Sequence, residues 1–104
     1  MMFRDVLTLI GEQPKAHGVT DAYREVTKEV YVAVQSVGRS EAYQAMQNGL
    51  HPQFVFVLSD YADYADQKIC EYQGKRYRVI RTYRKNQAIE LTVEEAAPKE
   101  ATTS

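Results

Sequence analysis

The side chains that most often carry out catalysis are few in this sequence and poorly spaced. The one cysteine, Cys70, lies in an apolar strand-like segment with no histidine nearby, which indicates a buried thiol rather than a nucleophile. The two histidines, His17 and His51, lack both the HxxxH spacing and the cysteine partners of common zinc sites. Glycine motifs that cradle phosphates or form a nucleophile elbow do not occur in the sequence. We therefore expect no enzyme activity, no metal and no cofactor.

An acidic tyrosine repeat, Asp-Tyr-Ala-Asp-Tyr-Ala-Asp, occupies residues 60–66. Its aspartates step by three, whereas an EF-hand calcium loop needs acids that step by two around a central glycine. A solvated acidic loop is therefore the better interpretation. We treat Asp60, Asp63, Tyr64 and Asp66 as candidates for contact with a partner or a neighbouring subunit.

The sequence also contains a strongly basic block. Residues 68–87 hold seven basic residues and one acidic residue, a balance of +6, while residues 1–67 balance to −4 and residues 88–104 to −3. Tyrosines interleave the cations, as in strands that contact phosphates and stack on bases. Strands that alternate a buried tyrosine face with a solvent-exposed basic face explain this interleaving equally well. The candidate residues for a DNA channel or a basic interface are Lys75, Arg76, Arg78, Arg81, Arg84 and Lys85.

Length and composition set the class. The 104 residues and 11.9 kDa correspond to one small domain, and 44% hydrophobic residues are ordinary for a globular protein. The eleven aromatic residues, eight of them tyrosine, favour a sheet-rich chain. A single cysteine excludes an internal disulfide, and no apolar run approaches the ~18–20 residues that span a bilayer. The N-terminus lacks the pattern of a secretory signal.

The local patterns predict strands, one helix and a tail. Gly11 and Pro14 are expected to end the first strand, and a loop is expected over residues 11–24. The two strands 69–72 and 75–83 are expected to join at a tight turn containing Gly74, with a bulge at residues 79–80. The remaining expected strands cover residues 3–10, 28–37, 54–58 and 89–94, and residues 95–104 are expected to be a disordered tail.

Two of these strands carry specific expectations about burial. Residues 54–58 are apolar on both faces, so this strand is either covered twice or half exposed to a partner. In the last strand Ile89, Leu91 and Val93 point inward, and the expected outward residues are Glu90, Thr92 and Glu94.

The helix is expected at about residues 40–49, with Ser40 as its N-cap and Gly49 just beyond its C-terminus. Tyr43, Met46 and Leu50 form its apolar stripe. A helix of this length is marginal alone in water, so the stripe must dock on the home sheet or on another subunit. The sequence therefore predicts a mainly β protein, a small antiparallel barrel or sandwich of about six strands with one short inserted helix, in a single domain over residues 1–94.

The ordered set of segments resembles a known family. The most telling parts are Ser-Glu-x-Tyr-x-Ala at residues 40–45 and Tyr-x-Gly-Lys-x-Tyr-x-Val-Ile at residues 72–80. Together with residues 3–9, 30–39 and 49–52 they resemble the head–tail joining proteins, the head-closure or stopper subunits in the necks of tailed phages of Gram-positive bacteria. The resemblance covers about residues 3–94.

The resemblance implies a virion protein of the neck that assembles in the host cytoplasm. Such subunits form a ring, dodecameric in the family, below the portal and adaptor, where they retain packaged DNA and offer a surface to the tail or a tail-completion protein. Genomic DNA would pass non-specifically, no membrane partner is implied, and the role is mechanical rather than catalytic. Two alternatives stay open: a tail-completion protein of the same neck, and a stand-alone nucleic-acid-binding barrel that uses the basic hairpin of residues 75–85.

Overall fold

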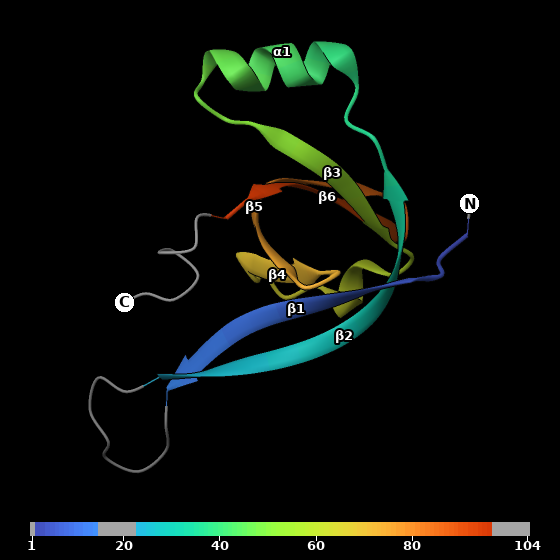
Figure 1. Cartoon of the computed structure of the whole chain (residues 1–104). Helices are drawn as coiled ribbons and strands as arrows, with labels where there is room; N and C mark the ends of the chain where they lie inside the picture. The colour runs from blue at the N-terminus through green and yellow to red at the C-terminus, as the bar shows by residue number, and fades with distance from the viewer. Residues whose placement is uncertain (1, 15–22, 97–104) are drawn as a thin grey trace.

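Six antiparallel strands close into a barrel in the computed structural model, which describes residues 2–14 and 23–96 (Figure 1). The strands are hydrogen-bonded in the order β1-β2-β3-β6-β5-β4, and β4 pairs with β1 to complete the barrel. The expected mainly β architecture with one inserted helix is thus confirmed. The elements are β1 (Asp5–Pro14), β2 (Tyr23–Gln35), α1 (Arg39–Gln47), β3 (Pro52–Leu58), the 3-10 turn η1 (Tyr61–Asp63), β4 (Ile69–Tyr72), β5 (Lys75–Lys85) and β6 (Ala88–Glu95).

The first two strands are longer than the sequence predicts. β1 continues through Gly11 to Pro14, and β2 already begins at Tyr23, so the expected loop over 11–24 is wrong at both of its ends. The two strands pair along the whole of β1, and this ladder overrides the local breaking tendency of Gly11, which pairs with Val26. Pro14 is tolerated because it stands at the strand end. Residues 15–22, including His17, lie outside the described residues.

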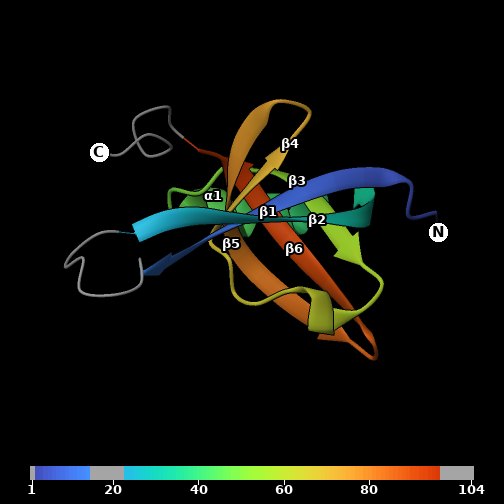
Figure 2. The same ribbon diagram turned by 90° about the horizontal axis from the view of Figure 1, so that it is seen from below.

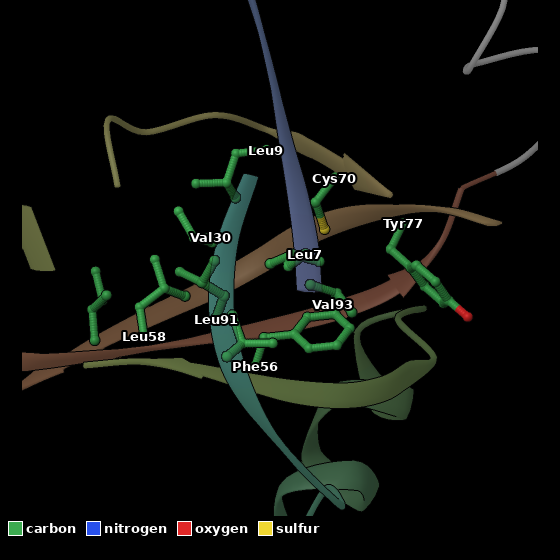
Figure 3. Packing of buried hydrophobic residues seen from close by; sticks show 11 residues of the cluster. Leu7, Leu9, Val30, Phe56, Leu58, Cys70, Tyr77, Leu91 and Val93 are labelled. Carbon is green, nitrogen blue, oxygen red and sulfur yellow. The ribbon is translucent and has the colours of Figure 1, made fainter. Parts of the chain in front are cut away.

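The main core fills the barrel interior (Figure 3). Inward residues alternate along every strand, and eight of them are essentially inaccessible to solvent: Phe56, Leu7, Leu9, Leu58, Leu91, Val32, Val93 and Cys70. Three rings gather around Phe54, whose ring centroid lies 5.6 Å from that of Tyr77, 5.7 Å from that of Phe56 and 5.9 Å from that of Tyr72. Tilted and edge-to-face contacts of this kind add to the burial of the rings. The many tyrosines therefore belong partly to the core.

A second, smaller apolar cluster lies on the opposite face of β2 and β3. Ala33, Val55 and Val57 are buried there, with Phe3 and Val37 packed against them. Since Phe56 and Leu58 of the same strand are buried in the barrel, β3 is covered on both faces. This confirms the first of the two alternatives expected for residues 54–58, a strand that is covered on both faces.

The hairpin of β4 and β5 has the expected tight turn and bulge. Gln73 and Gly74 both have positive φ, 52° and 80°, as a two-residue hairpin turn requires. The β5–β6 register shifts between Val79 and Arg81, which confirms the bulge and leaves Ile80 as its extra residue.

The last strand departs from simple alternation in its burial. Thr92 and Glu94 were expected to point to solvent, yet only 6% and 5% of their surfaces are exposed. Both lie on β6, which is flanked by β3 and β5, and both are contacted by residues from the segments outside the barrel. The strand also reaches Glu95, and the Ala96 N–H donates to the Arg76 carbonyl, so the first two residues of the expected tail belong to the barrel. Residues 97–104 lie outside the described residues.

Candidate interaction surfaces

Helix α1 stands on the connection between β2 and β3, apart from the barrel (Figure 1). None of its residues is buried. Tyr43 is 68% exposed and Met46 is 54% exposed, so these two members of the expected stripe do not dock on the home sheet. Of the two docking sites expected from the sequence, the home sheet is therefore not used by these residues. Docking on another subunit stays a prediction.

The ends of the helix are only partly as expected. Its N-cap is Gly38 and no side chain caps the first turn, because Ser40 already lies inside the helix; the expected Ser40 cap is wrong. At the other end Gly49 has φ 79°, and its N–H donates to the Met46 carbonyl, which confirms its place beyond the C-terminus.

A polar contact, rather than apolar packing, ties α1 to the barrel. Glu41 Oε2 lies 3.0 Å from Nη1 of Arg81 on β5 and accepts a longer hydrogen bond, 3.5 Å, from the Thr92 hydroxyl. Between the helix and the barrel there is an open cleft of about 220 Å³. Leu50, the third member of the stripe, lines this cleft with Pro52 and Ile80. The side of α1 that carries Tyr43 and Met46 is therefore left as an apolar surface without a partner among the described residues.

The acidic tyrosine repeat lies across one end of the barrel and is bonded to it (Figure 2). Asp60 caps η1 by accepting from the Ala62 N–H at 2.9 Å, and it also accepts from the Gln87 amide at 2.9 Å. These hydrogen bonds hold the pKa of Asp60 below its ordinary value. Asp63 lies 3.5 Å from Lys28 Nζ, in an ion pair that joins the turn to β2.

The tyrosines of the repeat face the interior. Tyr61 and Tyr64 pack against the main cluster, and the Tyr64 hydroxyl donates to the Gln67 carbonyl at 2.7 Å. Burial, with the nearby charge of Asp66, raises the pKa of Tyr64 to about 12. Asp66 itself has φ 62° at the end of the repeat. The segment therefore closes the barrel end, and three of its candidate residues, Asp60, Asp63 and Tyr64, already make contacts within the chain's own fold.

Most cations of the basic hairpin have acidic partners within the chain. Arg76 binds Glu25 of β2 at 3.1 Å, and Lys75 lies 3.6 Å from Glu95. The hydrogen bond and charge of Arg76 lower the pKa of Glu25. Arg81 binds Glu41 of the helix, as described above.

The last arginine of the hairpin uses an aromatic partner. The Arg84 guanidinium carbon lies 3.5 Å from the centroid of the Tyr61 ring, a cation–π contact that joins β5 to the acidic repeat. Lys85 is exposed at the end of β5. The hairpin is thus less available to phosphates than its sequence charge suggests, because internal carboxylates neutralise most of it.

Glu94 is the most buried of the acidic residues that pair with the basic hairpin, and it was not among the candidate residues drawn from the sequence. Glu94 accepts from Arg78, by a short hydrogen bond from Nη2 and by one of 3.1 Å from Nε, and from the His51 N–H at 3.0 Å. Its side chain is 7% exposed. Burial alone would raise the pKa of Glu94, but these hydrogen bonds hold it below its ordinary value. Arg78 and Glu94 lie opposite each other on β5 and β6, and this pairing could have indicated the contact. It follows only once the strand register at the bulge is known.

Cys70 is buried, as expected, and burial raises the pKa of its thiol to about 12. A thiol of this kind is protonated at neutral pH and is a poor nucleophile. Across residues 2–14 and 23–96, no three His, Cys, Asp or Glu side chains gather in a way that could hold a metal ion. In the same part of the chain no helix has the length and apolar character needed to cross a bilayer. The chain matches no protein-family model, and no curated protein matches it.

Proposed function

We propose that this chain is a structural subunit of the neck of a tailed phage, a head-closure protein that forms a ring below the portal and adaptor. In that role it retains packaged DNA and offers the attachment surface for the tail. The sequence resemblance described above motivates the proposal. Head-closure proteins are small β-barrels with a helix on a long insertion, and the closed barrel with a helix inserted between β2 and β3 agrees with that fold.

The observation that carries the proposal is the unpacked helix. A helix of nine residues gains too little from its own hydrogen bonds to be stable in water. Here it buries no residue and exposes Tyr43 and Met46 together. An apolar helix face held away from the core is typical of a surface that becomes buried in an assembly.

The test is assembly on the connector. We expect the purified chain to be monomeric or weakly associated alone, and to form rings, visible by electron microscopy, on the portal–adaptor complex of the same phage genome. The double variant Tyr43→Ser/Met46→Ser should lose ring formation while keeping its unfolding midpoint. The matched control is Met2→Ser/Val6→Ser, which alters similarly exposed apolar residues away from the helix.

Two results would contradict the proposal: failure of the wild-type chain to bind the connector, or an equal loss of assembly in the control variant. If the chain instead binds only after the tail has been added, the tail-completion role is favoured.

The nucleic-acid-binding alternative gains no support from the geometry, because Arg76, Arg78 and Arg81 already face carboxylates. It predicts steeply salt-dependent binding of DNA by the isolated monomer. An anisotropy titration at low salt with a labelled duplex and a labelled single strand measures this directly. Tight binding there would favour the alternative over the neck role.

A further inference from the structure

The barrel is closed, but two of its strands extend past the neighbours that should cover their edges. β2 pairs with β3 only from Val32 to Gln35, so its residues 25–31 have β1 on one side and no strand on the other. β5 pairs with β4 only as far as Arg78, so its residues 81–85 have β6 on one side and no strand on the other. We call these segments the β2 edge and the β5 edge.

Both edges are accessible. Residues 25–29 and 81–85 are all exposed, and β1 and β2 run together beyond the rest of the barrel (Figures 1 and 2). Among the described residues, the one backbone hydrogen bond between β5 and the preceding loop comes before the β5 edge, from the Val79 N–H to the Lys68 carbonyl. The acidic repeat contacts each edge through side chains, Asp63 at Lys28 and Tyr61 at Arg84, but no strand among the described residues pairs with the open side of either edge. A strand edge of this kind is a template for pairing with another chain.

Their residue types suit such pairing. The β2 edge contains Val26, Thr27, Val30 and Tyr31, residues that favour extended backbone. The edges are seven and five residues long, counted over 25–31 and 81–85, close to an ordinary strand.

Charge favours pairing between unlike edges. On the β2 edge, Glu25 and Lys28 are neutralised by Arg76 and Asp63, so Glu29 is left without an ion pair among the described residues. On the β5 edge, Arg81 is neutralised by Glu41, so Arg84 and Lys85 carry the remaining charge. Two β5 edges would repel each other, whereas a β5 edge and a β2 edge attract.

We propose that the β5 edge of one copy pairs with the β2 edge of the next, which makes one intermolecular sheet from copy to copy. The proposal rests on the proposed ring and specifies its contact. The contact is head-to-tail, because each copy offers two different surfaces, and contacts of this type generate rings when the rotation closes.

Cysteine cross-linking tests the pairing. Thr27→Cys and Thr82→Cys place one thiol on each edge, and the native Cys70 is buried and does not interfere. On the connector, with a short bismaleimide, the doubly substituted chain should give a ladder of cross-linked oligomers. An equal mixture of the two single variants should give dimers, and each single variant alone should give none.

The outcomes separate this inference from the proposed function. Rings that assemble without cross-linking would overturn the strand pairing and leave the neck role standing. Cross-linked dimers from one single variant alone would overturn it as well, because they require like edges to meet. Failure to form any ring would overturn both.

A charge exchange gives a second measurement. We expect Glu29→Lys to lower the association constant about two- to five-fold, the scale of one exposed ion pair, and the added change Lys85→Glu to restore it. Glu12→Lys is the matched control, since Glu12 is an exposed acid on β1 that pairs with Glu25 on the side of β2 already covered by β1, not on its open side. Equal effects of Glu29→Lys and Glu12→Lys would contradict the assignment.

Discussion

The barrel interior and helix α1 are opposite solutions for apolar residues within one short chain. The interior buries Phe56, Leu7 and Leu9 completely, whereas the helix buries nothing and leaves Tyr43 two-thirds exposed. The apolar residues of the barrel interior are stabilised by burial against the rest of the chain. The exposed apolar residues of α1 would gain a burial free energy only by contact with another molecule. The difference indicates that the barrel holds the core of the chain, and the proposed function makes α1 a contact element carried on it.

The largest expected effect tests the barrel side of this comparison. Phe56→Ala removes a fully buried ring that contacts Tyr72 and Tyr77, and should cost about 3–5 kcal/mol of unfolding free energy. Tyr43→Ala should change the same quantity by no more than about 0.5 kcal/mol. Urea titration followed by far-UV circular dichroism measures both. Similar losses in the two variants would show that the helix contributes to the fold as the core does.

A smaller effect is expected at Glu94, a charged group inside the barrel wall. Glu94→Gln should cost about 1–3 kcal/mol at pH 7, because the Arg78 hydrogen bonds lose their charged acceptor. The pKa of Glu94 is lowered in the folded state, so its contribution is full above the ordinary carboxyl value of about 4.3 and is lost as pH falls through the folded pKa.

The difference in unfolding free energy between wild type and Glu94→Gln should therefore shrink below about pH 4. Urea titrations from pH 3 to pH 7 measure this. Glu95→Gln is the control, because Glu95 is in an exposed pair with Lys75 and should change stability by less than about 1 kcal/mol. A difference that stays constant with pH would contradict the assigned role of the Glu94 carboxylate.

A small effect on stability is also expected where helix α1 and the barrel touch. Glu41→Gln weakens the contact with Arg81 and should change the unfolding free energy by less than about 1 kcal/mol. Amide hydrogen exchange within α1 should nevertheless accelerate several-fold, while exchange in β3 and β6 stays unchanged. Arg39→Gln, on the same helix but away from the cleft, is the control. Acceleration in the barrel strands would show that the helix and barrel unfold together.

Features set by neighbouring residues could be predicted from the sequence. The turn at Gln73 and Gly74, the bulge beside Val79 and the helix ending before Gly49 each have a local signal, and each was found. The double burial of β3 followed from the absence of polar residues in 54–58.

Features set by distant residues could not be predicted. Gly11 and Pro14 indicate a strand end locally, but the long ladder with β2 holds the strand through them. The basic hairpin meets Glu25, Glu41 and Glu94, which no spacing in the sequence relates to it. The free strand edges are likewise invisible in the sequence, because they depend on how far each neighbour extends.

The insertion that carries α1 leaves and re-enters the barrel at neighbouring strands, since Gln35 of β2 pairs with Val55 of β3. Its two ends are therefore held together whatever lies between them. Closing a flexible loop costs only about 0.6 kcal/mol more when its length doubles. The reach of the helix above the barrel can thus lengthen or shorten at little cost to folding, which in the proposed neck role would let one scaffold meet connectors of different dimensions.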